Sequence, residues 1–193
     1  MSPIDPRDLV LVRHAPAETG GRLCGRRDVS ARLDDADALA RLAGALAPCA
    51  RVVASPARSY HQTAEALSPG RVADADPRLW EQDFGEHEGL EPAALPDLGP
   101  LDLVALARHA PPGGESFADM VARAAPALTD LAESAGGSGP VAVVAHAGTV
   151  RAGLALALGC VPAALAFEVA PLSLTRLRLA GGGWSVGLVN GRV

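Results

Sequence analysis

The feature that most constrains the fold is a set of three short apolar runs, each of which ends directly in polar side chains. The runs occupy residues 9–12, 52–54 and 141–145. Continuous apolar runs of this length are typical of strands that are buried on both faces, as the strands of parallel sheets are. Segments with helical spacing of apolar residues separate the runs, at 33–46, from 55 to about 67, and at 116–133. This alternation predicts an α/β fold of three layers, with a mostly parallel central sheet and helices on both faces.

A stretch rich in proline and glycine, at about 77–114, interrupts the alternation and contains one helical segment at 101–108. We expect it to be an excursion over the active site within a single domain of residues 1–193, and not a separate domain. Further elements are predicted as a weak strand at 71–75, a helix from about 149 to 158, and a closing hairpin formed by 172–179 and 184–189.

The charge of the chain limits its partners. Seventeen basic residues against 22 acidic residues give a formal net charge of -5, so we expect no general binding to nucleic acid or to an anionic membrane. Every basic residue is an arginine. The absence of lysine excludes Schiff-base chemistry, pyridoxal phosphate attachment and the lysine-dependent phosphate loop. Any bound phosphate must therefore be held by a local group of arginines and other donors.

The three cysteines are too scattered to predict a disulfide framework or a zinc site. The N-terminus shows no signal peptide. The longest uncharged stretch, 152–167, is short for a membrane span and is interrupted by Gly159 and Pro162. We therefore expect a cytoplasmic protein, and the sequence leaves open whether it forms a homodimer.

The polar residues that follow the apolar runs are the candidate site. Because the carboxyl ends of parallel strands meet at one edge of a sheet, we expect Arg13, His14, Arg58 and His146 to converge there. Arginine offers forked donors to phosphate oxygens, and a neutral imidazole is a competent nucleophile towards phosphorus. A single histidine is more often structural, and we assign His61 and, likewise, His109 to that class while leaving His87 open.

Five segments resemble, in order, the motifs of the histidine phosphatase superfamily, which includes the cofactor-dependent phosphoglycerate mutases. Arg13-His14-Ala15 resembles its Arg-His-Gly signature. The other four segments are Ser55-Pro56 with Gln62-Thr63-Ala64, Leu79 to Gly89, Gly114-Glu115-Ser116, and Val143 to Gly148. Together the segments cover nearly the whole chain.

The resemblance implies a role for each matching residue. His14 would accept the phosphoryl group as a phosphohistidine, and Arg13 and His146 would bind the phosphate oxygens. Glu81 would protonate the leaving oxygen and then deprotonate the attacking water. Neither a metal nor a cofactor would be needed. Since Glu81 must carry a proton when substrate is bound, we expect burial and the bound phosphate to raise its pKa moderately, against the effect of the arginines.

This chain departs from the family pattern at several positions. The family's phosphate-binding arginine falls at Ser59, and Arg58 stands one place earlier. We expect Arg58 to reach the same pocket from the start of its helix. Alanine replaces glycine at Ala15 and Ala147, and His87 replaces a tryptophan. These changes leave the expected nucleophile and acid in place.

The stretch from Gly21 to Asp28 resembles a run in the α-ribazole phosphatases of cobalamin synthesis. The function that follows is a metal-independent phosphomonoesterase acting on a small phosphorylated metabolite, with α-ribazole 5'-phosphate as the leading candidate. Two alternatives stay open. One is a non-catalytic phosphate-binding or regulatory member of the fold, and the other is a phosphotransferase of the phosphoglycerate mutase type.

Overall fold

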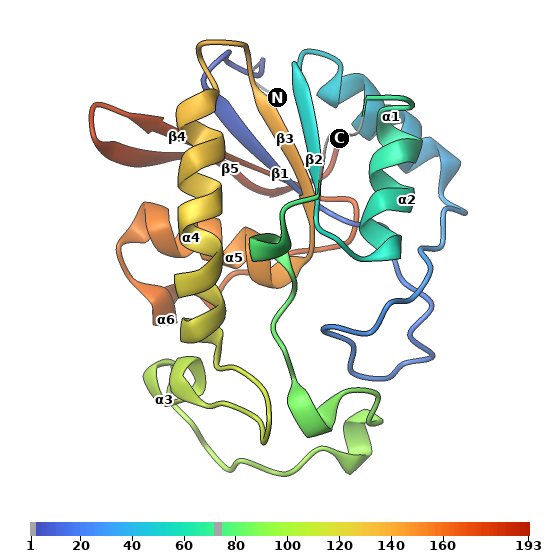
Figure 1. Ribbon diagram of the computed structural model, residues 1–193, viewed down its shortest axis with the longest axis vertical. Helices are drawn as coiled ribbons and strands as arrows, with labels where there is room; N and C mark the ends of the chain where they lie inside the picture. The colour runs from blue at the N-terminus through green and yellow to red at the C-terminus, as the bar shows by residue number, and fades with distance from the viewer. Residues whose placement is uncertain (1–2, 72–74) are drawn as a thin grey trace.

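The computed structural model describes residues 3–71 and 75–193, which fold around one five-stranded sheet (Figure 1). Its strands lie in the order β2-β3-β1-β4-β5. They are β1 (Asp8–Arg13), β2 (Arg51–Ala54), β3 (Val141–Ala145), β4 (Leu174–Ala180) and β5 (Gly183–Gly191).

The α/β prediction is confirmed, and the three predicted apolar runs are the three parallel strands β2, β3 and β1. The predicted C-terminal hairpin also forms. It joins the same sheet as β4 and β5, antiparallel to β1 and to each other, so the sheet is mixed. Residues 72–74 of the weak strand expected at 71–75 lie outside the described residues.

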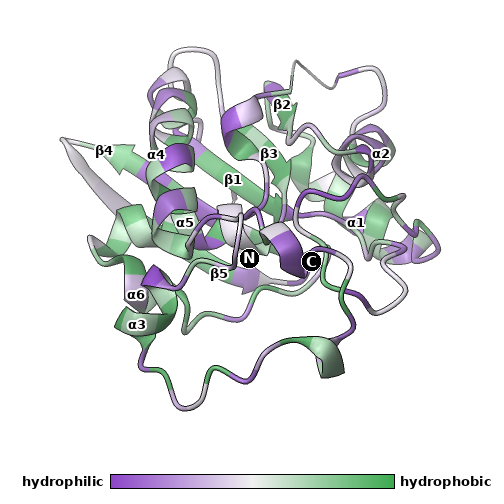
Figure 2. Ribbon diagram, turned by 60° about the horizontal axis from the view of Figure 1, so that its bottom comes forward, coloured by the Kyte–Doolittle hydropathy of each residue, from purple (hydrophilic) through white to green (hydrophobic). Residues whose placement is uncertain are grey.

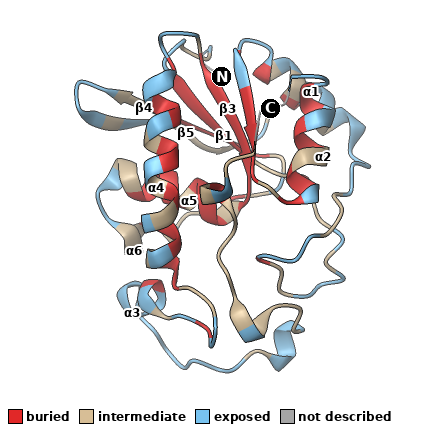
Figure 3. Cartoon of the chain, in the orientation of Figure 1, coloured by how far each residue is buried: buried red, intermediate tan, exposed pale blue. Residues whose placement is uncertain are grey.

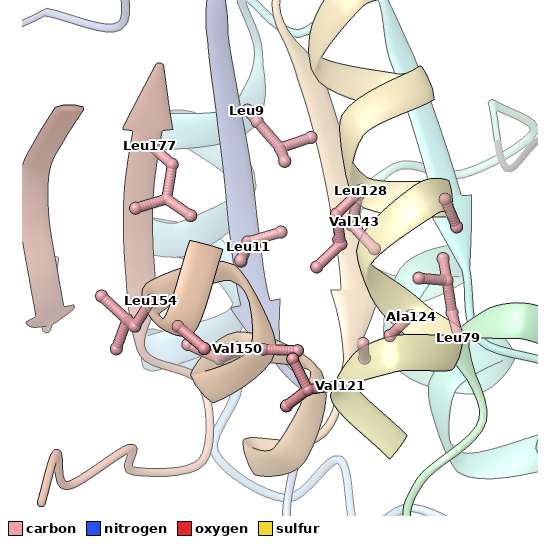
Figure 4. Close-up of a cluster of buried hydrophobic side chains, with 14 of the residues drawn as sticks. Leu9, Leu11, Leu79, Val121, Ala124, Leu128, Val143, Val150, Leu154 and Leu177 are labelled. Carbon is pink, nitrogen blue, oxygen red and sulfur yellow. The ribbon is translucent and has the colours of Figure 1, made fainter. Parts of the chain in front are cut away.

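Helices cover both faces of the sheet. The helices α1 (Ala36–Leu46) and α2 (Arg58–Leu67) lie on one face, and α4 (Phe117–Ser134), α5 (Ala147–Leu158) and the short α6 (Val161–Ala164) lie on the other (Figure 1). Successive side chains of a strand point to opposite faces. Leu9 and Leu11 therefore pack against α4 and α5 (Figure 4), whereas Val10 and Val12 pack against α1 and α2. Figure 3 shows the central strands buried along most of their length.

Polar caps decide where the helices begin. The carboxylate of Asp35 accepts a hydrogen bond from the backbone of Ala38 at 3.0 Å, so α1 starts at residue 36 and not at 33. Ser116 and Asp119 form a capping box at the start of α4. At α5 the cap is His146, whose Nδ1 lies 3.3 Å from the backbone nitrogen of Thr149. The helix therefore starts directly after the histidine, two residues earlier than expected.

The excursion expected at about 77–114 contains three single turns of 3-10 helix and the helix α3 (Leu103–Arg108). The turns are η1 (Pro77–Leu79), η2 (Gly85–His87) and η3 (Pro92–Ala94). Figure 1 shows this segment leaving the sheet, running beyond the carboxyl ends of β1, β2 and β3, and returning to α4. In Figure 2, α3 is largely hydrophobic, although three of its apolar side chains remain exposed, namely Leu103, Val104 and Leu106. In the described part of the chain, no helix has both the length and the apolar character needed to cross a bilayer.

Candidate active site

A cavity of about 270 Å³ opens at the carboxyl ends of β1 and β3. Four of the five predicted site residues line it, namely Arg13, His14, Glu81 and His146. The other lining residues are Pro16, Ala17, Thr19, Cys24, Arg27, Val29, Ser59, Tyr60, Ala147 and Pro171. The arrangement places one imidazole, two guanidinium groups and a carboxylate–imidazole pair around a space that could hold a phosphate ester.

His14 follows β1 directly and is held from two sides. Its backbone nitrogen donates to the carbonyl of Ala145 at 2.7 Å, and the next nitrogen along, that of Ala15, donates to Thr63 Oγ1 at 3.1 Å. The ring of Tyr60 meets the imidazole edge-on, with centroids 4.7 Å apart. Burial, together with the nearby charges of His146 and Arg13, lowers the pKa of His14 to about 4. The ring is therefore neutral at neutral pH, with a lone pair for nucleophilic attack.

Glu81 and His146 form a buried pair. Glu81 Oε2 lies within ion-pair distance of His146 Nδ1, and its two oxygens accept from the backbone of Gln82 at 2.9 Å and of Gly148 at 3.4 Å. Burial acts to raise the pKa of Glu81. The charge of His146 and these hydrogen bonds outweigh burial and lower that pKa below its ordinary value.

The direction expected from the sequence, a raised pKa for Glu81, is therefore wrong for the unliganded site. The prediction considered the arginines and burial but not His146, which lies 65 positions away in the sequence and contacts the carboxylate directly. The carboxylate and the imidazole thus lie together beside the cavity, where a proton shared by the pair would be within reach of a leaving oxygen.

The backbone carbonyl of Leu79 fixes the other side of His146. It accepts hydrogen bonds from Ser55 Oγ at 2.8 Å and from Thr149 Oγ1 at 3.4 Å, and His146 Nε2 lies 3.1 Å from it. The same Nε2 lies 2.7 Å from Thr149 Oγ1, so these contacts hold the ring with Nδ1 towards Glu81. The serine of the Ser55-Pro56 motif thus helps to position Glu81, because it binds the carbonyl of Leu79 in the same segment.

The same segment is held from the outside by Arg123 of α4. Its Nη1 donates to the carbonyls of Arg78 at 2.8 Å and Trp80 at 3.1 Å, and its Nη2 donates to that of Glu81 at 3.2 Å. The guanidinium is also paired with the carboxylate of Glu115. The glutamate of the Gly114-Glu115-Ser116 motif therefore has a structural function, because it orients the arginine that positions Glu81.

Arg13 reaches the cavity from the last position of β1. Its Nη1 donates to the carbonyl of Val169, and its Nε is buried and has no hydrogen-bond partner among the described residues. Burial lowers the pKa of this guanidinium. Arginine remains charged in proteins, so Arg13 presents a positive charge to the cavity.

The structure does not bring Arg58 into the cavity. Its side chain is 58% exposed and forms an ion pair with Asp28 at 3.7 Å. Consecutive residues of a helix point about 100° apart, and at the start of α2 it is Ser59 that faces the cavity. Arg58 therefore cannot replace the family arginine merely by standing one position earlier.

Three cavity residues were missed as site residues from the sequence, namely Arg27, Tyr60 and Cys24. Tyr60 follows Ser59 directly in α2, and because consecutive helix residues point about 100° apart, a helical wheel does not place it at the site. Cys24 and Arg27 lie in a loop without regular structure, whose path the sequence does not define. Burial raises the pKa of the Cys24 thiol, so this cysteine is protonated at neutral pH and does not compete with His14 as a nucleophile.

Comparison with known proteins agrees with this geometry. A profile of the histidine phosphatase superfamily (branch 1) matches residues 9–191. A glucosyl-3-phosphoglycerate phosphatase of Mycolicibacterium vanbaalenii is 32% identical over 170 residues, which cover 79% of this chain and 75% of the relative. The structure of a mycobacterial glucosyl-3-phosphoglycerate phosphatase complexed with VO3 superposes with a TM-score of 0.82 at 29% identity, over 96% of this chain and 99% of that one. The α-ribazole phosphatase of Shigella flexneri has a TM-score of 0.81 at 19% identity, over 96% and 97%, and shows the same fold.

The chain belongs to the histidine phosphatase superfamily, branch 1. Its curated relatives are named phosphatases, and the chain is a phosphoric monoester hydrolase of this superfamily.

Proposed function

We propose that this enzyme hydrolyses a small phosphorylated metabolite through a phosphohistidine at His14. The observation that carries the proposal is a buried imidazole with a lowered pKa in the same cavity as a guanidinium and a carboxylate–imidazole pair. Because the pKa of His14 is about 4, its imidazole is neutral at higher pH and keeps its lone pair throughout the physiological range.

In the first step the imidazole lone pair of His14 forms a bond to phosphorus while the ester P–O bond breaks. The leaving oxygen takes the proton held between Glu81 and His146 and departs as an alcohol. In the second step Glu81 accepts a proton from water, and the resulting hydroxide displaces the phosphoryl group from His14 as inorganic phosphate. The carboxylate is thus an acid first and a base second, and returns to its starting state.

Charge stabilisation in this mechanism comes from protein groups. Arg13 and His146 face the cavity, and the N-terminus of α5 begins directly after His146. Preorganised donors of this kind stabilise the additional negative charge of the transition state. We therefore propose that hydrolysis proceeds without a metal ion.

Among substrates, glucosyl-3-phosphoglycerate is the first candidate, because relatives of that name match about three quarters of the chain at 32–34% identity. The α-ribazole 5'-phosphate expected from the loop at 21–28 is the second candidate, since the likeness to the α-ribazole phosphatase is one of fold. Phosphoryl transfer of the mutase type is a third outcome, and it requires that the phosphohistidine be stable against water.

A substrate panel in EDTA tests the proposal. We expect hydrolysis of p-nitrophenyl phosphate without added metal, and a higher kcat/KM for glucosyl-3-phosphoglycerate than for α-ribazole 5'-phosphate. Release of inorganic phosphate distinguishes hydrolysis from transfer. Activity that disappears in EDTA and returns with a divalent cation would rule out the metal-free mechanism.

Replacing Gly148 by alanine should displace the acid. A Cβ atom at this position would lie 2.1 Å from Glu81 Oε1 and 3.0 Å from Met120 Cε. The carboxylate would have to move by about 1 Å, and a misplacement of this size can cost about 100-fold in rate. We expect Gly148→Ala to lower kcat for alkyl phosphates by about 10- to 100-fold.

A matched control is available in α1, where a Cβ on Gly44 would meet no atom within 4 Å. Gly44→Ala should keep full activity and gain up to about 1 kcal/mol in stability, because alanine favours the helix. Equal activity of the two variants would show that the approach of Glu81 to Gly148 is not needed.

The protonation of His14 can be measured directly by NMR titration of the imidazole in the substrate-free enzyme, assigned by comparison with His14→Asn. We expect a midpoint near pH 4, since burial opposes the charged form. Direct titration is preferable to kcat/KM because a phosphate ester itself titrates near pH ~6. A midpoint near the ordinary histidine value would mean that the ring is solvated and not prepared for attack.

A further inference from the structure

Two arginines of the described chain line the cavity, and they come from different elements. Arg13 ends β1, whereas Arg27 belongs to the long loop between β1 and α1. The sequence pointed to Arg58 as the second guanidinium, but that side chain faces solvent and Asp28.

Other arginines around this loop are neutralised by carboxylates. Arg22 pairs with Glu91 at 2.7 Å, and Arg26 pairs with Glu115 at 3.4 Å. Arg58 pairs with Asp28. Within residues 3–71 and 75–193, no carboxylate forms an ion pair with Arg27. Arg32, which also lies in this loop and forms no ion pair among these residues, does not line the cavity. Arg27 is thus the cavity-lining arginine of the loop whose charge is available to a bound anion.

Hydrogen bonds join this loop to the excursion and fix the backbone position of Arg27. The backbone nitrogen of Leu23 donates to the carbonyl of Leu90 at 2.9 Å, and the carbonyl of Leu23 accepts from the backbone nitrogen of Gly89 at 2.9 Å. The carboxylate of Glu88 accepts from the backbone nitrogens of Gly25 at 3.1 Å and Arg26 at 2.8 Å. The carboxylate of Glu88 therefore holds the backbone of the two residues that precede Arg27.

The side chain of Arg27 and the residue after it are also held. The guanidinium of Arg27 lies against Gly89, where an added Cβ would be 2.3 Å from Nη1. Asp28 accepts a hydrogen bond from the backbone nitrogen of Arg58 at 2.7 Å, which ties the loop to α2. This hydrogen bond comes from the backbone of Arg58, so it does not depend on the exposed side chain of that residue.

We propose that Arg27 provides the second guanidinium that binds the phosphoryl group, in the place expected for Arg58. A phosphate monoester carries about -1.5 to -2 charges at neutral pH. The carboxylate of Glu81 is turned towards His146, and Arg13 supplies one positive charge to the cavity. Arg27 supplies the other. This assignment rests on the proposed function, since it assumes that the cavity binds the phosphoryl group.

The test compares Arg27→Ala with Arg58→Ala in the full-length protein. Inorganic phosphate is the probe, with its dissociation constant measured by isothermal titration calorimetry, and kcat/KM is measured with p-nitrophenyl phosphate. We expect Arg27→Ala to weaken phosphate binding at least about tenfold and to lower kcat/KM by about 100-fold or more. Arg58→Ala should change both by less than about threefold. Arg27→Lys, which keeps the charge but not the fork, should recover part of the phosphate affinity.

An unchanged phosphate affinity in Arg27→Ala would overturn the assignment, even if turnover of larger esters fell, because Arg27 would then contact another part of the substrate. An equal loss of phosphate affinity in Arg58→Ala would overturn it as well. Failure of the proposed function is distinguishable from both results. If the wild-type enzyme binds phosphate through Arg27 but forms no phosphohistidine, the mechanism fails and the assignment stands.

Discussion

Replacing His14 by alanine is expected to abolish turnover, with a loss of at least about 10³-fold in kcat for every phosphate ester. The imidazole is the group that forms the covalent bond, and no other side chain of the cavity is prepared for that function, since the Cys24 thiol is protonated. Losses of this size or larger are typical when a nucleophile is removed. The measurement is steady-state release of inorganic phosphate, with thermal unfolding to confirm that the variant is folded.

The control for this prediction is His61→Ala, which removes a histidine of the neighbouring helix α2 that does not line the cavity. It should keep turnover within about twofold of the wild type. His14→Ala should still bind inorganic phosphate, because Arg13 and Arg27 remain. Substantial residual turnover in His14→Ala would mean that water attacks the ester directly, and the covalent mechanism would have to be abandoned.

Replacing Glu81 by glutamine is expected to separate the two chemical steps. Glutamine has nearly the same shape but cannot donate or accept the catalytic proton. Formation of the phosphohistidine from an alkyl phosphate should slow by about 10²- to 10⁴-fold, because the alkoxide departs without a proton. Formation from p-nitrophenyl phosphate should slow by less than about tenfold, because nitrophenolate is stable as an anion. The second step should be slow for both substrates, because no base activates the water.

Rapid mixing resolves these steps. Glu81→Gln should release one equivalent of nitrophenolate in a burst and then turn over slowly, whereas an alkyl phosphate should give no burst. The matched control is Asp83→Asn, whose carboxylate accepts from the backbone nitrogen of Gly85 at 2.8 Å and does not line the cavity. It should resemble the wild type. If Glu81→Gln slows the first step equally for both substrates, Glu81 is not the acid for the leaving group.

Local pattern was sufficient to predict the parallel part of the sheet and three of the four predicted site residues that the structure brings together. Buried parallel strands are continuous apolar runs. Because the carboxyl ends of parallel strands lie at the same edge of the sheet, the polar residues that follow these runs are brought together there. Arg13, His14 and His146 follow from this rule alone. Glu81 required the resemblance to a family, because it lies in a stretch without periodic pattern.

The parts that could not be predicted depend on side-chain direction and on contacts between distant segments. Arg58 and Ser59 are adjacent in sequence, but their directions differ by a helical step, and only the fold shows which one faces the cavity. The lowered pKa of Glu81 depends on His146, which is brought to it by the start of α5. The position of Arg27 depends on a loop held by hydrogen bonds to the excursion, and loop paths are poorly encoded in composition.

The structure explains why several motif residues matter although they do not line the cavity. Ser55 binds a backbone carbonyl of the segment that carries Glu81, and Glu115 pairs with Arg123, which binds other carbonyls of that segment. Thr63 binds the backbone next to His14. The site is thus built as a few side chains that face the substrate and a surrounding set that fixes their positions.

The central claim is a covalent phosphohistidine at His14, and a rapid-quench experiment tests it most directly. The wild-type enzyme is mixed with labelled substrate in EDTA, quenched in alkali within milliseconds, and digested for mass spectrometry. We expect a label that is stable in alkali and labile in acid, located on His14 and formed at the rate of the first chemical step. A labelled Cys24, or full turnover with no labelled protein at any quench time, would contradict it.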